Sequence, residues 1–197
     1  KYKRYFGAKL IPSRGAWLEF ETEQNGVISV RIDRKRKIAA TALLRAFGVA
    51  GDEEIKKLFA DLDTDESVKY ILATILQDPS SNESEALIEL YKRIRPGDPA
   101  TLDTAKQMVQ NMFFNPARYD LSKVGRFRMN KRFGENLDVE EKKDRVLRAQ
   151  DIIFILREII RLNNDPHAEP DNIDHLGNRR VKTLGELLQD RLRVAFA

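Results

Sequence analysis

The stretch WLEFETEQNGVISVRID, residues 17–33, decides how the N-terminal part of this chain folds. Apolar side chains occupy every second position of its two halves, residues 18–20 and 28–32. A period of two is typical of strands with one buried face. Asn25-Gly26 stands between the halves, and this pair favours a type I′ turn because both central residues of that turn need positive φ. We therefore predict an antiparallel hairpin over residues 17–33.

The same alternation assigns a face to the single tryptophan. If Leu18 and Phe20 point into the core, Trp17 falls on the opposite face together with Glu19 and Glu21. A tryptophan on a polar face is unusual. We expect Trp17 to be largely exposed.

Size and composition exclude several classes of protein. The 197 residues can bury one good core or two small ones, and 42% hydrophobic residues are too many for a disordered chain. Cysteine is absent, which excludes a disulfide scaffold and suits a reducing cytoplasm, and the presence of only two histidines, His167 and His175, argues against a histidine metal centre. No apolar run reaches the roughly 18–20 residues that cross a bilayer, and no signal peptide is visible. The chain begins without Met and stops inside a helical pattern at Ala197, so we expect a fragment of a longer polypeptide.

Beyond the hairpin the patterns predict mainly helices. We expect them over residues 38–47, over 52–60, after a Ser84 cap, over 101–114, after an Asp151 cap through Leu162, and after a Thr183–Glu186 capping box. Arg95-Pro-Gly-Asp-Pro99 must be a loop, because two prolines and a glycine in five residues cannot continue a helix. Residues 163–182 form a long polar connection, and loops of that length tend to be functional or mobile.

The predicted fold class is α+β and mostly helical: an N-terminal hairpin region, a helical body and a C-terminal helix. The corresponding segments are residues 1–48, 49–162 and 163–197. Charge is distributed unevenly along them. Residues 1–45 carry 11 Lys/Arg and 4 Asp/Glu, residues 52–67 carry 7 acids and two lysines, and residues 118–133 carry 6 bases and one acid. Such blocks indicate charged partners or, as the simpler alternative, ordinary solvated faces.

Signatures of catalysis are missing from the sequence. It contains no GxxxxGK[ST], GxGxxG, HExxH or GxSxG motif. Asp61, Asp63 and Asp65 alternate as in a cation loop, but the glycine and the distal glutamate of an EF-hand are lacking, so a solvated acidic loop is the better interpretation. Asp171, Asp174 and His175 could form a carboxylate–imidazole pair, but a third partner is lacking and a hydrogen-bonded loop explains them better.

Three basic clusters indicate nucleic-acid chemistry instead. They are residues 31–37, residues 118–132 with Tyr119, Phe127 and Phe133 interleaved, and residues 179–182. Guanidinium groups bind phosphates in a bidentate manner, and exposed aromatic rings stack on unpaired bases. The alternative is that the aromatic residues are core and the bases are solvated.

The chain also resembles a known family, the bacterial RNA polymerase β subunit. The segment Ile173-Asp-His-Leu-Gly-Asn-Arg-Arg180 is similar to a highly specific motif of that family. Four other segments match in the same order: Ile11–Trp17, Val30–Lys37, Arg95–Pro99 and Arg118–Arg126. The resemblance covers essentially the whole chain. It implies the lobe beside the DNA channel and a return into the adjoining protrusion, with residues 49–82 much shorter than in many relatives.

The resemblance implies roles for individual residues. Trp17 matches a tryptophan that stacks on an unpaired base of the non-template strand. Asp174 matches an aspartate that accepts hydrogen bonds from a flipped guanine, and Ile173 and Arg179 match the lining of the same pocket. Arg126 matches a contact to the single-strand backbone. The family also has a gate loop that touches NusG-type elongation factors, and the residues that match it here are Arg95, Pro96, Gly97, Asp98 and Pro99.

The implied function is a non-catalytic, DNA-contacting lobe in DNA-templated transcription, and the alternative is a protein-docking module for a transcription regulator. The implied partners are the non-template strand, downstream duplex DNA, the β′, α and ω subunits, sigma factor and a NusG-type factor, in the cytoplasm and without a membrane. No cofactor is expected in this chain, since the catalytic Mg²⁺ of the whole polymerase is held by β′ aspartates. A small independent enzyme is a distant third interpretation.

Overall fold

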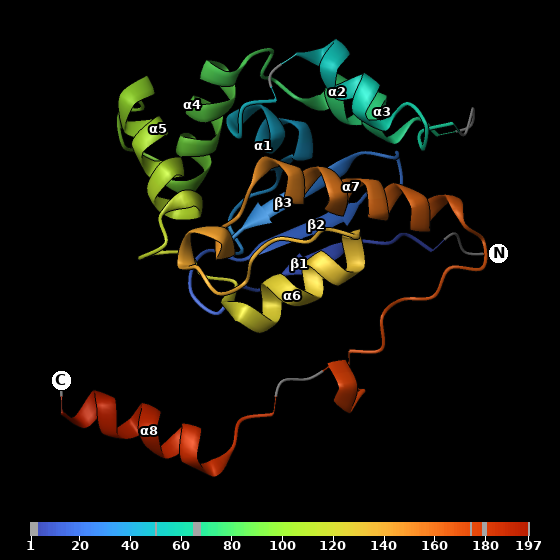
Figure 1. Cartoon of the computed structure of the whole chain (residues 1–197). Coiled ribbons are helices and arrows are strands. Elements are labelled where there is room, and N and C mark those ends of the chain that lie inside the picture. The colour runs from blue at the N-terminus through green and yellow to red at the C-terminus, as the bar shows by residue number, and fades with distance from the viewer. Residues whose placement is uncertain (1–3, 50, 65–67, 174, 179–180, 197) are drawn as a thin grey trace. The chain divides into compact units, whose positions relative to one another are not determined.

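A computed structural model describes residues 4–49, 51–64, 68–173, 175–178 and 181–196 of the chain. The chain forms two compact units, Lys1–Pro166 and His167–Ala197. The strands are β1 (Ala8–Leu10), β2 (Leu18–Thr22), β3 (Ile28–Ile32) and β4 (Ile38–Ala39). The first unit holds the α-helices α1 (Ala40–Ala46), α2 (Asp52–Phe59), α3 (Tyr70–Gln77), α4 (Glu83–Ile94), α5 (Leu102–Val109), α6 (Ser122–Phe133) and α7 (Ala149–Asn164). This composition confirms the α+β, mostly helical fold class (Figure 1).

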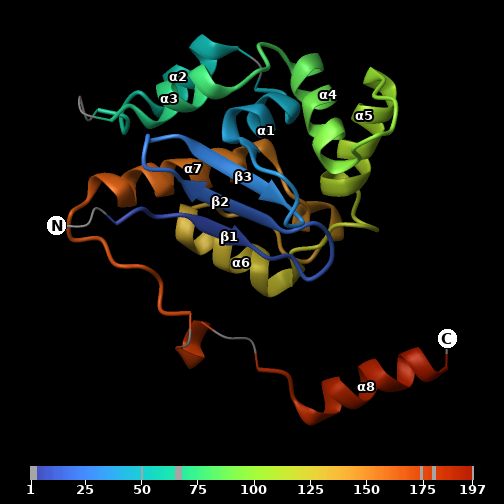
Figure 2. The same ribbon diagram turned by 180° about the vertical axis from the view of Figure 1, so that it is seen from behind.

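The four strands form one antiparallel sheet in the order β1-β2-β3-β4. Leu18 pairs with Ile32 and Phe20 pairs with Val30, and all four side chains are buried. In Figure 1 α6 and α7 lie against one face of the sheet, and Figure 2 shows the other face of β1 and β2 from behind. The predicted hairpin and its alternating pattern are therefore confirmed, because one face meets helices and the other meets solvent.

The turn of this hairpin differs from the prediction. Glu23 N donates to Val27 O over 2.8 Å and Gly26 N donates to Glu23 O over 3.0 Å, so the strands are joined by a longer loop than Asn25-Gly26 alone. Gly26 has a φ of 85°, whereas Asn25 is not among the described residues with positive φ. The Asn25 side chain accepts a hydrogen bond from Val27 N at 3.1 Å. The loop is thus a three-residue turn with a glycine bulge and not a type I′ turn.

Several helix boundaries also differ from the expected ones. Residues 38–39 belong to β4, and the helix expected there begins at Ala40. The cap of α4 is Asn82, whose side chain accepts from Glu85 N at 2.9 Å, and not Ser84. The predicted helix over residues 101–114 is α5 continued by a π-helical turn, Gln110–Phe114. Asp151 lies in the first turn of α7, after the cap residue Arg148, so it is not the cap that we predicted.

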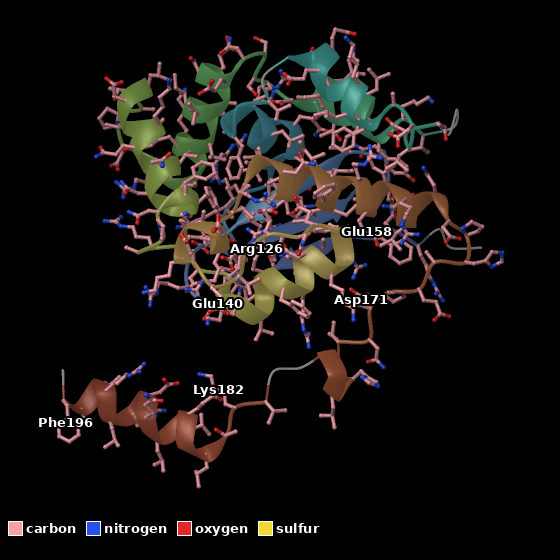
Figure 3. All side chains as sticks on the ribbon, in the orientation of Figure 1. Arg126, Glu140, Glu158, Asp171, Lys182 and Phe196 are labelled. Carbon is pink, nitrogen blue, oxygen red and sulfur yellow. The ribbon has the colours of Figure 1, made fainter. Side chains whose placement is uncertain are left out.

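A buried ion pair joins α6 to α7. Arg126 and Asp151 are both fully buried, and Nη1 and Nη2 of Arg126 lie 2.7 and 3.0 Å from the two carboxylate oxygens. Arg126 also donates to the carbonyl of Val146, and Asp151 accepts from Arg148 N at 2.9 Å. Figure 3 labels Arg126 among the side chains of the first unit. The expectation that Arg126 contacts DNA is therefore corrected: its guanidinium is held inside the protein.

The loop that contains Arg14 is hydrogen-bonded to the loop that contains Asp120. Arg14 N donates to Asp120 O at 3.1 Å, and Asp120 N donates to Arg14 O at 2.9 Å. Between them Gly15 adopts a φ of 120°, and a β-carbon there would lie 2.5 Å from the Tyr119 ring. Only glycine allows this close approach of the loops.

The second unit contains a short 3₁₀ turn, Leu176–Asn178, and α8 (Leu184–Ala195). Thr183 and Glu186 form the predicted capping box: Glu186 N donates to Thr183 Oγ1 at 3.4 Å and Thr183 N donates to Glu186 Oε2 at 3.2 Å. The residues of α8 are exposed or partly exposed, including Leu184, Leu188 and Leu192. An uncovered leucine stripe favours packing against another protein segment.

Replacing Arg126 by methionine should destabilise the chain strongly. The Asp151 carboxylate would stay buried and lose its main partner, which typically costs about 3–5 kcal/mol. Arg132→Met is the matched control in the same helix, because Arg132 pairs with Glu158 at the surface and should cost no more than about 1 kcal/mol. Urea unfolding of both variants measures the difference. Equal losses for the two variants would contradict a structural role of the buried pair.

Replacing Gly15 by alanine should disturb the junction of the two loops. Gly48→Ala is the control, because Gly48 also has a positive φ, 98°, but nothing lies within 4 Å of the position that a β-carbon would take there. Both variants place alanine at a positive φ, but only in Gly15→Ala does the new β-carbon collide with Tyr119. This collision should lower the free energy of unfolding by about 1–3 kcal/mol more than in Gly48→Ala. Thermal unfolding tests this. A Gly15→Ala chain as stable as Gly48→Ala would show that the loops do not need the close approach.

Candidate nucleic-acid interface

Three loops of the first unit form a connected surface, which we call the three-loop platform: residues 11–17, 33–37 and 115–121. Trp17 N donates to Asp33 Oδ1 at 2.7 Å, and Asp33 N donates to Trp17 O at 3.0 Å, which joins the first loop to the second. The Arg14–Asp120 backbone pair joins the first loop to the third. Leu121 N donates to Arg145 O at 3.0 Å and ties the third loop to the body of the unit.

The platform carries an excess of exposed positive charge. Its exposed cations are Arg14, Arg34, Lys35, Arg36 and Arg118. Its two carboxylates are engaged with backbone amides: Asp33 accepts from Trp17 N, and Asp120 accepts from Ser122 N at 2.7 Å. A surface of this kind attracts phosphate groups. Lys37, the last basic residue of the segment 33–37, binds the sheet instead: its ammonium group lies 2.8 Å from the Glu21 carboxylate. This hydrogen bond raises the pKa of Lys37 and lowers the pKa of Glu21.

Trp17 lies at the centre of the platform. Its side chain is half-buried and not largely exposed as predicted, and the Arg34 guanidinium lies over the indole, 5.2 Å from the ring centroid. Trp17 nevertheless stays outside the core cluster that contains Leu18 and Phe20. An indole outside the core with a guanidinium over its ring has the chemistry of a platform for an unpaired base.

The aromatic residues of the second basic cluster are mostly structural. Tyr119 is fully buried, and burial raises the pKa of its hydroxyl above the usual range. Phe133 stacks on Phe154, with ring centroids 5.3 Å apart. Phe127 is exposed on α6, so it alone of the three aromatic residues predicted as stacking platforms presents its ring to solvent.

The predicted guanine pocket falls largely outside the described residues. Asp174 and Arg179 are not described, and Ile173 is 76% exposed in the second unit. The roles of these three residues therefore stay predictions.

The predicted gate loop connects α4 to α5 as an exposed turn. Asp98 N donates to Arg95 O at 3.4 Å, Pro96 occupies the second position of the turn, and Gly97 has a φ of 97°. These are the features of a type II turn. All five residues from Arg95 to Pro99 are exposed, which makes the loop accessible to a partner.

The acidic loop over residues 61–65 has structural contacts. Asp61 binds Arg157 through two hydrogen bonds of 2.8 and 2.5 Å, and this guanidinium lowers the pKa of the Asp61 carboxyl. Asp63 accepts from the backbone amides of Tyr70 and Ile71 at 2.9 and 3.0 Å, so it caps α3. Asp65 lies outside the described residues. No group of three or more His, Asp or Glu side chains in the described part of the chain is arranged to hold a metal ion.

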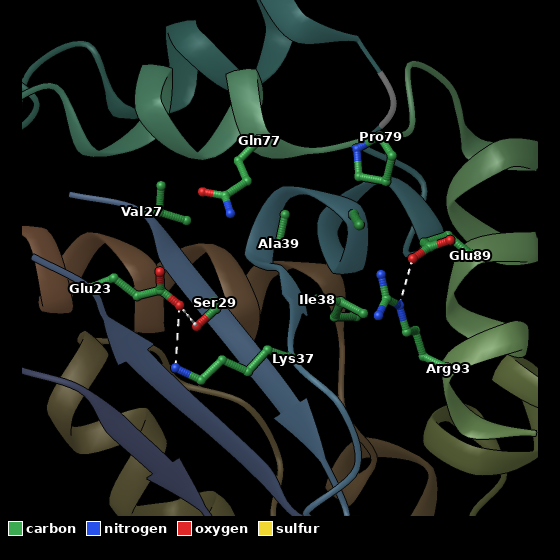
Figure 4. Close-up of a pocket in the computed structure, with 11 residues that line it drawn as sticks. Glu23, Val27, Ser29, Lys37, Ile38, Ala39, Gln77, Pro79, Glu89 and Arg93 are labelled. Carbon is green, nitrogen blue, oxygen red and sulfur yellow. Dashed lines mark hydrogen bonds and ion pairs between the residues drawn. The ribbon is translucent and has the colours of Figure 1, made fainter. Parts of the chain in front are cut away.

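A small polar cavity of about 130 Å³ lies between β3, β4, α1 and α4 (Figure 4). The charged side chains at its wall pair with one another: Lys37 Nζ lies 3.3 Å from Glu23 Oε1, and Arg93 Nε lies 2.7 Å from Glu89 Oε1. Ser29 also donates to Glu23 at 3.3 Å. The cavity thus has internal partners for its charges and is a weaker candidate site than the platform.

Sequence reasoning missed the contribution of Arg14 to the interface. The only signal was the Arg14-Gly15 pair inside the segment Ile11–Trp17, where a glycine beside an arginine permits a tight approach. The partner, Asp120, lies more than a hundred positions away in the sequence, and no local pattern connects the two residues.

Searches for similar proteins identify the family. The family model described as RNA polymerase Rpb2, domain 2, matches residues 2–182. The DNA-directed RNA polymerase subunit beta of Chloroflexus aggregans is 50% identical over 96% of this chain and 17% of its own length. The corresponding subunits of Dehalococcoides mccartyi strains BAV1 and CBDB1 are 49% identical over 95% of this chain and 15% of their own lengths.

The chain therefore spans about a sixth of the length of these relatives. Among the described residues, no helix is both long and apolar enough to cross a membrane. The match to the family model covers nearly the whole chain, and the five sequence motifs agree with it. The chain belongs to the RNA polymerase Rpb2, domain 2, family and is similar over most of its length to the β subunits of bacterial RNA polymerases.

Proposed function

We propose that this chain is a non-catalytic, DNA-contacting part of a bacterial RNA polymerase, and that its three-loop platform holds the unpaired non-template strand. The observation that carries the proposal is Trp17, a half-buried indole under the guanidinium of Arg34, in a platform whose three loops carry exposed cations. Cations beside an aromatic ring bind a single strand by neutralising its phosphates while one base stacks. Duplex DNA offers no unstacked base, so it engages the cations alone.

The family supplies the context for this binding. In a β subunit the chain would act in the cytoplasm with the β′, α and ω subunits and sigma factor, and the metal chemistry would reside in β′. Ile173, Asp174 and Arg179 would read a flipped guanine, since a carboxylate can accept hydrogen bonds from the N–H donors of the guanine Watson–Crick edge. Arg126 has no part in the proposal, because it is buried.

A protein-docking role is the second candidate, and the Arg95–Pro99 loop favours it. The loop is exposed, and its flanking helices α4 and α5 contribute to a groove of about 560 Å³ whose lining includes both apolar and charged side chains, among them Leu87 and Lys106. An exposed turn is accessible to a protein partner, and the partner that the family resemblance implies is an elongation factor of the NusG type. The two roles are compatible in a whole polymerase and differ in their response to salt, because phosphate binding is strongly salt-dependent.

Trp17→Ala should weaken binding of single-stranded DNA to the chain. Loss of one stacked base typically costs about 1–3 kcal/mol, which is roughly 5- to 150-fold in the dissociation constant. Phe127→Ala, which removes the exposed ring on α6, is the control and should leave the affinity within about twofold. Anisotropy titration with a labelled single strand measures both, after circular dichroism has verified folding. Equal affinities for Trp17→Ala and the wild type would refute Trp17 as the stacking residue.

Replacing Arg95–Pro99 by a short glycine linker should weaken binding of a NusG-type factor to the whole polymerase and leave the chain folded. The loop residues are exposed, so their removal costs the core nothing, whereas a factor that docks there loses its contact. Pull-down of reconstituted polymerase measures the factor, and the same preparation measures single-strand binding, which should not change. Full retention of the factor would show that the loop is not its docking site.

A further inference from the structure

The turn after β3 adopts an unusual backbone conformation. Asp33 and Arg34 have φ values of 46° and 59°, and Lys35 N donates to Ile32 O at 2.9 Å. Two consecutive positive φ angles are typical of a mirror-image turn, which normally contains Asn and Gly. Arginine seldom adopts this region, and strain of this kind accumulates where it serves a function.

The strained turn places the Arg34 guanidinium over the Trp17 ring. The Asp33 carboxylate and amide bind the backbone of Trp17 on both sides, at 2.7 and 3.0 Å, so the turn and the ring form one unit. Trp17 is half-buried, whereas Arg34 is exposed, and the guanidinium carbon lies 5.2 Å from the ring centroid. The exposed Arg34 guanidinium therefore covers one face of the half-buried indole.

We propose that Arg34 is a removable cover of the Trp17 stacking surface that moves from the ring to a phosphate when a single strand binds. A cation–π contact at an exposed site is weak, so a base can displace the guanidinium at little cost. The freed guanidinium then gains charge-assisted hydrogen bonds to a phosphate of the incoming strand. The platform should therefore prefer a single strand to a free nucleobase. A strand offers both a base for Trp17 and a phosphate for Arg34, whereas a free nucleobase has no phosphate that Arg34 could bind.

This inference rests on the proposed single-strand binding, but the cover itself can be tested without DNA. Trp17 is the only tryptophan of the 197 residues, so fluorescence reports this ring alone. Acrylamide quenching of the free chain should be stronger in both Arg34→Ala and Arg34→Lys than in the wild type, because neither side chain has the planar guanidinium. Lys35→Ala is the matched control: Lys35 is an exposed cation of the same turn, and its loss should leave quenching unchanged.

The second measurement is the affinity of the chain for single-stranded DNA at increasing salt concentration. One lost phosphate contact lowers the slope of log affinity against log salt by roughly 0.7 for a single strand. We expect this decrease in Arg34→Ala, and no decrease in Arg34→Lys, which keeps the charge. Quenching that is unchanged in both Arg34 variants overturns the cover. Increased quenching with an unchanged slope in Arg34→Ala overturns the transfer to phosphate.

A different result would refute the proposed function itself. If a single strand leaves the emission and anisotropy of the wild-type chain unchanged, single-strand binding is refuted, and with it the transfer of Arg34 to a phosphate. The quenching comparison of the free variants still decides separately whether Arg34 covers Trp17.

Discussion

The buried ion pair between Arg126 and Asp151 is the interaction on which the rest of the first unit depends. Two opposite charges without solvent exposure must be matched to each other, because an unmatched buried charge is far more costly than an unmatched surface charge. The pair fixes α6 against the start of α7. Leu121, just before α6, is bonded to Arg145, and Asp120 is bonded to Arg14. A sequence of short contacts thus leads from the centre of the unit to the surface loop that holds Trp17.

The charges of the unit are organised so that the loops, and not the sheet, attract an anion. On the solvent face of the sheet Lys9 pairs with Glu19 at 3.1 Å, and Glu21 is bonded by Lys37 at 2.8 Å and by Arg31 at 3.5 Å. These cross-strand pairs neutralise the face locally. The platform loops carry cations whose neighbouring carboxylates already accept backbone hydrogen bonds. The exposed cations that remain available to a phosphate group are therefore those of the platform loops, and one of them, Arg34, lies over the indole.

The hairpin, the place of Trp17 outside the core and the cap of α8 could be predicted because each rests on a local rule of strand alternation or capping. The helix α6 could not, since its buried positions include Arg126 and Asn130 while Val124 and Phe127 are exposed, which reverses the usual amphipathic pattern. The resemblance implied a DNA contact for Arg126, but its partner Asp151, distant in sequence, makes it a core residue. The positive-φ pair was expected at Asn25-Gly26 and occurs at Asp33-Arg34, where hydrogen bonds to Trp17 override the preference of the residues.

The most direct test of the account is photo-crosslinking of the chain to single strands that carry one iodinated uracil, followed by peptide mapping. Iodouracil crosslinks to an aromatic ring only when the two are in close contact. If the platform holds the strand, the principal adduct lies on Trp17, its yield falls with added salt, and an iodinated duplex of the same sequence does not form it. An adduct on Phe127 with Trp17 unmodified would place the single strand on α6 and contradict the three-loop platform.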